Sequence, residues 1–202
     1  MLQPRAPLDH GRVLAAFDAA AEAFLANVRQ VEHWEAPGLG EWTVRELVAH
    51  TLRAFTTIET YLDAPLASDA AQVDATEYHR IGMSLPNVHT GVAERGRQAA
   101  RTLSDPVGQS DEIAARVVAL ARVTPPDRPI QVISGRMVFT DYLATRTVEL
   151  GLHTLDIQHA LGAPPLLPGG ATELCLDVLL GLPDPIELLL AITGRRTLNV
   201  LG

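Results

Sequence analysis

Apolar residues recur every three or four positions along most of this chain of 202 residues, as they do in helices that bury one face. Thr43 and Glu46 have the spacing of a capping box, which marks the start of one such helix. The pattern predicts four long helices, over residues 9–32, 43–62, 88–123 and 140–161. The stretch 104–108 can interrupt the third of them, because it contains proline and glycine.

The segments between these helices are polar or rich in proline and glycine. Residues 64–87 are predicted to form a long loop with short helical turns. Residues 124–129 form a rigid connection, and residues 130–139 can hold a brief extended segment. After residue 168 we expect two short helices, the second of which begins at Asp184 as its N-cap.

These elements predict an all-α fold in which four helices pack as a four-helix bundle. The bundle is expected over residues 1–163, and residues 164–202 are expected to form a short helical extension packed on it. Aromatic residues make up only 4% of the chain, and alanine, leucine and valine dominate, which favours helices. Long loops after the second and third helices leave the connectivity of the bundle open.

Composition and charge exclude several classes of function. A net charge of −8 argues against a nucleic-acid partner. The sequence also has no cluster of basic residues of the kind that binds a membrane surface. All 16 basic residues are arginine, which excludes lysine Schiff-base chemistry and a P-loop. The one cysteine, Cys175, lies in an apolar run and is predicted to be a buried structural thiol. Since the N-terminus lacks an apolar signal core, we expect a cytoplasmic protein.

Four polar residues of the last long helix share one helical face. They are separated by steps of 3, 4 and 3 positions, and they are Arg146, Glu149, His153 and Asp156. Leucine, isoleucine and valine flank this stripe on both sides, so we expect it to point into the protein. Because burying charged groups without partners is unfavourable, these residues need one another, a metal ion or a ligand.

Glu149 and His153 are neighbours on that face, and both are ligands that borderline divalent metals accept. His50 is the candidate third ligand, because it lies at the edge of the apolar face of the second helix. Two bundle helices can direct ligands toward each other in this way. A second interpretation stays open from the residues alone: a hydrogen-bonded Glu149–His153 pair and a His50 that is a satisfied core residue.

Two stretches resemble the signatures of a known family. Residues 42–52 (WTVRELVAHTL) resemble the pattern W-T-V-x-[DE]-L-[VL]-x-H-L of the DinB-like, mycothiol-dependent maleylpyruvate isomerases. Residues 146–156, followed by the sequence ALG at 160–162, resemble the second signature of that family. Residues 192–195 resemble the ending of its close relatives, and the resemblance covers roughly residues 9–202.

The resemblance implies a DinB-type bundle that binds one divalent metal ion, commonly zinc, through a His, Glu, His triad. In this chain the triad is His50, Glu149 and His153. Three protein ligands leave one coordination position open, as in catalytic metal sites. In the family the low-molecular-weight thiol mycothiol occupies or approaches that position, and a homodimer is a further expectation from the resemblance.

Several other residues are candidates for supporting roles. The isomerases of the family carry a thiol-binding arginine in a larger C-terminal domain, for which Arg195 and Arg196 are the candidate counterparts here. Arg146 either holds a substrate carboxylate or neutralises the neighbouring acids. Asp156 either fixes the tautomer of a ligating histidine or bonds to a loop amide. Trp42 is interpreted chiefly as a hydrophobic staple at the start of the second helix.

The remaining histidines have no partner at ligand spacing. His79 and His89 lie in or next to the loop predicted over residues 64–87. That loop could cover a metal ion, so both residues remain less favoured candidates for the metal site. We interpret the others as solvated or structural, and these are His10, His33 and His159.

The leading functional hypothesis is a metal-dependent, mycothiol-dependent enzyme that acts on a small electrophilic substrate. It would be an isomerase or a thiol S-transferase, with the substrate and the thiol as its partners. A metal-dependent hydrolase is the first alternative, because an open metal position can also activate water. A non-catalytic bundle that binds a metal or small ligand, or a structural helical dimer without metal, remains as a further alternative.

Overall fold

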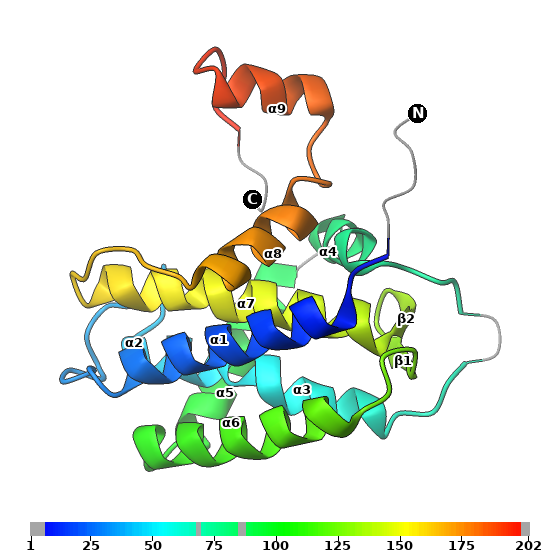
Figure 1. Cartoon of the computed structure of the whole chain (residues 1–202). Helices are drawn as coiled ribbons and strands as arrows, with labels where there is room; N and C mark the ends of the chain where they lie inside the picture. Colours follow the sequence, from blue (N-terminus) through cyan, green and yellow to red (C-terminus); the bar gives the residue numbers. More distant parts are fainter. Residues whose placement is uncertain (1–6, 68–69, 85–87, 199–202) are drawn as a thin grey trace.

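The computed structural model describes residues 7–67, 70–84 and 88–198, without the side chains of residues 88–93 and 95. Most of the described chain is helical, which confirms the predicted all-α fold (Figure 1). In chain order the elements are α1 (His10–Val28), α2 (Val44–Thr51), α3 (Arg53–Leu62), α4 (Ala75–Ser84), α5 (Val88–Thr102), α6 (Pro106–Val123), β1 (Pro129–Val132), β2 (Gly135–Val138), α7 (Phe139–Ala160), α8 (Gly169–Leu179) and α9 (Pro185–Ile192).

α7 is the central helix, and it contacts α1, α2, α3, α4 and α8. Figure 1 shows α1 running alongside it and α6 below α1, on the side away from α8. The rings of Phe17 and Phe24 in α1 pack against Phe55 in α3, with ring centroids 5.7 and 6.0 Å apart. All three rings are buried, so the main apolar core lies between α1, α3, α6 and α7.

α2 begins with the predicted capping box, and the structure confirms it. The side chain of Thr43 accepts a hydrogen bond from the Glu46 backbone N–H, and the Glu46 carboxylate accepts one from the Thr43 N–H. The predicted second helix is divided at Leu52 into α2 and α3. Thr51 Oγ1 donates to the carbonyl oxygen of Leu47 at 2.8 Å, and hydroxyls bonded in this way compete with the backbone and bend helices.

α4 lies where the sequence pattern predicted a long loop with short helical turns, and residues 75–84 form a continuous helix instead. Asp74 starts the helix, since its Oδ1 accepts a hydrogen bond from the Glu77 N–H at 2.8 Å. Thr76 Oγ1 donates to the carbonyl oxygen of Val178 in α8 at 2.9 Å. α4 also packs on α7, and these contacts with distant segments stabilise a helix of only 10 residues, which would be marginal by itself.

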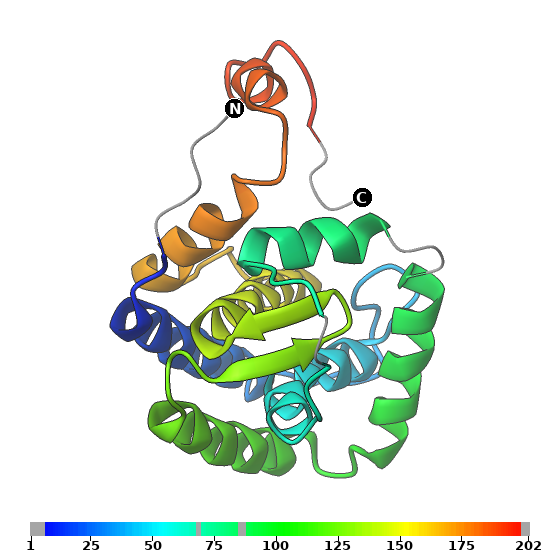
Figure 2. The same cartoon turned by 90° about the vertical axis from the view of Figure 1, so that its right-hand side faces the viewer.

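The extended segment predicted before α7 is an antiparallel hairpin of β1 and β2, with Ile130 opposite Met137. Figure 2 shows this hairpin across one end of the helices, with α4 above it and α5 to one side. Gly135 has φ 144°, and a Cβ there would lie 2.5 Å from the carbonyl oxygen of Ala71. The predicted interruption of the third helix is confirmed, because Asp105 caps α6 after α5 has ended.

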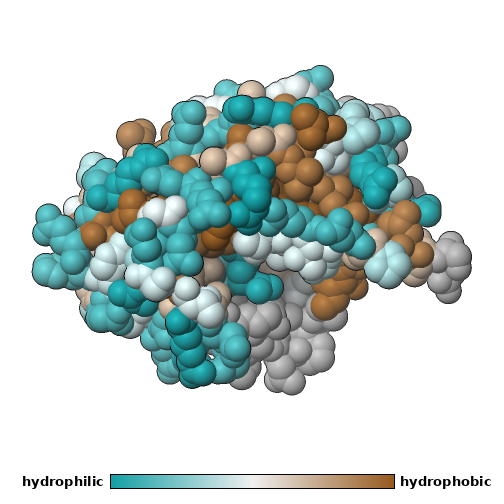
Figure 3. Space-filling view, turned by 90° about the horizontal axis from the view of Figure 1, so that it is seen from below, coloured by the Kyte–Doolittle hydropathy of each residue, from teal (hydrophilic) through white to brown (hydrophobic). Residues whose placement is uncertain are grey.

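The last two helices differ in how they contact the rest of the chain. α8 packs on α1 and α7, and Arg12 of α1 forms an ion pair with Asp177 at 2.6 Å. α9 has no buried residue and stands apart from the other helices in Figures 1 and 2. The opposite face, viewed in Figure 3, is largely hydrophilic around an apolar area. No helix in the described ranges is long and apolar enough to cross a bilayer.

Candidate metal centre

His50 lies in the last turn of α2, and the packing of that helix fixes its position. Val44, Leu47 and Val48 are buried and hold α2 against the core. The imidazole of His50 lies against the indole of Trp42, with ring centroids 4.7 Å apart. Trp42 is itself buried, so it forms a wall beside His50 in addition to the helix-start packing predicted for it.

α7 brings Glu149 and His153 to the same place. They are one helical turn apart, and Nε2 of His153 lies 3.5 Å from Oε2 of Glu149. The rings of His50 and His153 meet edge to face, with centroids 4.9 Å apart and planes at 82°. One ligand atom from each of the three residues lies within 4.8 Å of the other two. Side chains separated by 99 positions in the sequence (149 − 50) therefore converge.

The donor set and its spacing fit a single divalent ion. Two imidazole nitrogens and a carboxylate oxygen are ligands of borderline metals such as zinc, which bond them at about 2.0–2.2 Å. Donor atoms within 4.8 Å of one another need only a small contraction to reach one ion. The side chains of His153 and Glu149 are 17% and 32% exposed, so the group is partly shielded and still open to solvent.

Asp156 holds the ring of His153 in place. Nδ1 of His153 donates a hydrogen bond to Oδ2 of Asp156 at 2.9 Å, which leaves Nε2 directed at Glu149. A carboxylate in this position fixes the tautomer of a ligating histidine and makes its other nitrogen more basic. Burial lowers the pKa of His153, but the contacts with Asp156 and Glu149 outweigh burial and raise the pKa to about 9.

Arg146 is buried one turn before Glu149, and its charge acts on the site through space. Its Nε donates to Thr145 Oγ1 at 3.0 Å and its Nη2 donates to the Tyr78 hydroxyl at 3.0 Å. The guanidinium also lies over the rings of Tyr78 and Tyr142, at 5.3 and 4.9 Å from their centroids. Burial raises the pKa of Glu149, but the contact with His153 and the charge of Arg146 outweigh burial and hold that pKa below its usual range.

Sequence reasoning missed the contribution of α4 to this region. His79 was expected in a loop, but it lies in α4 and is only 8% exposed. Its neighbour Tyr78 is the acceptor for Arg146. No local signal in residues 64–87 points to this arrangement, because it depends on how α4 packs against α7.

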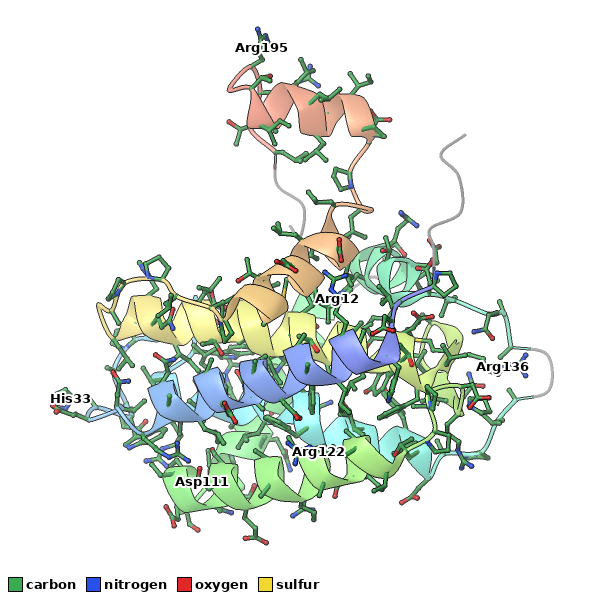
Figure 4. All side chains as sticks on the ribbon, viewed as in Figure 1. Arg12, His33, Asp111, Arg122, Arg136 and Arg195 are labelled. Carbon is green, nitrogen blue, oxygen red and sulfur yellow. The ribbon has the colours of Figure 1, made fainter. Side chains whose placement is uncertain are left out.

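The structure does not bring the other histidines to the triad. Nδ1 of His10 is hydrogen-bonded to Thr140 Oγ1 at 2.9 Å, and His159 is exposed at the end of α7. His33 lies in the loop after α1 and points away from the helices (Figure 4). The side chain of His89 lies outside the described residues.

The two arginines considered for thiol binding lie just beyond α9. Arg195 is exposed and points away from the helical core in Figure 4. Arg196 forms an ion pair with Glu187 of α9 at 2.5 Å. Neither is placed beside the triad. The thiol of Cys175 is buried, and burial raises its pKa to about 11, in keeping with a structural role.

Comparison with protein families gave a match that covers more than half of the chain. A family model described as the mycothiol maleylpyruvate isomerase N-terminal domain matches residues 32–158. The matched range begins after α1, ends within α7, and includes His50, Glu149 and His153. No curated protein and no solved structure matched the chain.

Proposed function

Because the chain belongs to the family of the mycothiol maleylpyruvate isomerase N-terminal domain, we propose that it is a metal-dependent enzyme that uses mycothiol to act on a small electrophilic molecule. The observation that supports this proposal is the convergence of His50, Glu149 and His153. Two of the three come from one helix and the third comes from another. Two imidazoles and a carboxylate with ligand atoms within 4.8 Å of one another form a donor set that one divalent ion can bind.

The ion that we propose is zinc. Bound by three side chains, it would keep one coordination position open and lower the pKa of a thiol placed there. The protein residues then have separate tasks. Asp156 holds the His153 ring, and the contact with His153 together with the charge of Arg146 keeps Glu149 in its charged form. Trp42 lies against His50 and excludes water from that side of its ring.

The proposed reaction class follows from the chemistry of a thiol with an electrophile. If the thiol adds to an activated double bond, rotation and elimination of the same thiol isomerise the bond. If the new S–C bond replaces a bond to a leaving group, the protein is a thiol S-transferase. Both reactions need the same bound thiol, so we propose this pair of activities together.

Metal analysis tests the site. Protein purified without chelators should contain about one zinc ion per chain, because one triad binds one ion. His50→Ala should remove most of that zinc, whereas His33→Ala should keep it because His33 points away from the helices. Full zinc content in His50→Ala would refute the assignment of the triad.

Spectroscopy tests the thiol. In protein loaded with cobalt in place of zinc, addition of mycothiol should shift the visible absorption bands, because a sulfur ligand changes the coordination of the ion. Full metal content together with unchanged bands would remove the thiol from the proposal. That result would favour the hydrolase or a non-catalytic binding protein.

A further inference from the structure

α4 is held firmly beside the stripe of polar residues on α7. Thr76 ties it to α8 through the hydrogen bond to Val178. Tyr78 ties it to α7, since its hydroxyl accepts the hydrogen bond from Arg146. These contacts on two sides fix the orientation of the helix, and with it the place of His79, the residue after Tyr78.

His79 has an unsatisfied polar atom. The residue is 8% exposed, and its Nε2 is buried with no hydrogen-bond partner among the described residues. Its ring meets that of Tyr78 edge to face, with centroids 5.4 Å apart, and this contact leaves Nε2 unpaired. Buried polar atoms without partners are uncommon and unfavourable, so such an atom calls for a partner that another state of the protein provides.

Glu149 lies on α7, three positions after Arg146, the residue that bonds to Tyr78 of α4. The charges of Glu149 and Arg146 both act on His79, and Glu149 is the carboxylate that does so. Burial lowers the pKa of His79 to about 4, with Glu149 opposing and Arg146 adding to that change. A neutral imidazole carries one N–H, which can serve as a donor to a carboxylate.

Glu149 has two oxygens but only one described partner in the triad. Its Oε2 faces His153 at 3.5 Å. A carboxylate that binds a metal through one oxygen is commonly held by a hydrogen bond to the other, and loss of such a partner weakens metal affinity. His79 lies on the neighbouring helix with a donor position to spare.

We propose that His79 is a positioning residue of the metal centre, whose Nε2–H donates a hydrogen bond to the Glu149 carboxylate when the triad holds its ion. This inference rests on the proposed metal site and adds α4 to it. The hydrogen bond would orient Glu149 toward His50 and His153, while His79 itself does not bind the ion. It also accounts for a histidine that is buried at this position in a helix otherwise poor in buried residues.

Zinc affinity and stability together test this role. In His79→Leu the apolar side chain keeps most of the volume and removes the donor. Its zinc dissociation constant, measured by competition with a chromophoric chelator, should rise about 10- to 100-fold. His79→Gln, whose amide can place an N–H near the position of Nε2, should recover most of the affinity. His33→Leu is the matched control and should bind zinc like the unchanged protein.

The melting temperature of zinc-free protein separates a positioning role from a structural one. Zinc-free His79→Leu should melt at the same temperature as the unchanged protein or higher, because an unpaired buried polar atom has been removed. Zinc affinity of His79→Leu within threefold of the unchanged protein would overturn the inference. So would a lower melting temperature combined with no recovery in His79→Gln. If the unchanged protein binds no zinc, the proposed function itself fails, which the same titration shows separately.

Discussion

Asp141 is a residue whose surroundings oppose its charge. It lies in the first turn of α7, and burial together with the nearby carboxylate of Asp74 raises its pKa from 3.8 to about 6. In the unfolded chain the carboxyl loses its proton near pH 4. Between about pH 4 and pH 6 the folded state therefore binds more protons than the unfolded state, and stability contributed by this group falls as pH rises.

Asp141→Asn should remove this loss of folding stability, because asparagine has no carboxyl group to ionise. We expect the variant to be more stable than the unchanged protein by about 1–2 kcal/mol at pH 7 and of similar stability at pH 4. Urea unfolding at the two pH values measures the difference. Asp127→Asn, at an exposed loop position, serves as the control and should change neither value. Equal stability of Asp141→Asn and the unchanged protein at pH 7 would contradict the prediction.

The sequence predicted much of the candidate site at this scale, because the residues of its polar stripe recur at helical spacing within one stretch of the chain. Glu149 and His153 are local neighbours, and their relation follows from helical spacing alone. Tyr78 and His79 could not be predicted, since their place beside Arg146 depends on packing between helices far apart in the chain. The same limit applies to the ring of Trp42 against His50, which spacing did not distinguish from a simple staple.

Among the helices, α5 touches the metal centre through a glycine. A Cβ on Gly96 would lie 3.1 Å from Cζ2 of Trp42 and 3.6 Å from Cβ of His50. The 3.1 Å contact requires the indole to shift by a few tenths of an ångström, and Trp42 lies against the His50 ring. The absence of a side chain at Gly96 therefore lets α5 approach α2 closely enough to support the position of His50.

Gly96→Ala should weaken the metal site. Overpacking against Trp42 is expected to lower stability by about 1 kcal/mol, even though alanine favours the helix. Displacement of His50 should raise the zinc dissociation constant several-fold in the chelator competition. Gly82→Ala in α4 is the matched control: its Cβ would have no neighbour within 4 Å, so we expect a gain of about 0.5–1 kcal/mol and unchanged zinc affinity. Equal zinc affinity in the two variants would show that Gly96 has no part in holding His50.

The elements that were predicted well carry their signals locally. The capping box of α2, the Asp105 cap of α6 and the Asp184 cap of α9 all form from residues within one turn. The missed features have distant causes. α4 depends on α7 and α8, and the approach of Gly135 to Ala71, unlike the extended segment itself, depends on another part of the chain.

In the molecule as a whole, the candidate site joins α2 to α7, two helices that already pack against each other. An ion bound only by the folded chain stabilises it by about 2.7 kcal/mol at a free concentration 100 times the dissociation constant. For a chain of this size we therefore expect zinc to raise the melting temperature by about 5–10 °C. A strong chelator should reverse the rise, as followed by circular dichroism.

His50→Ala provides the contrast for this measurement. Its melting temperature should respond little to zinc or to the chelator, because two ligands on one helix do not link α2 to α7. An equal response in His50→Ala and the unchanged protein would place the stabilising ion elsewhere in the chain.

The 99 positions between His50 and Glu149 (149 − 50) also bear on the order of folding. Contacts between residues so far apart require closure of a long loop, so the triad is complete only once α2 has docked on α7. Interactions that form after the folding transition state slow unfolding and leave the folding rate almost unchanged. The ion would then bind late in folding: it would not guide the chain to its fold, but it would lengthen the time that the chain stays folded.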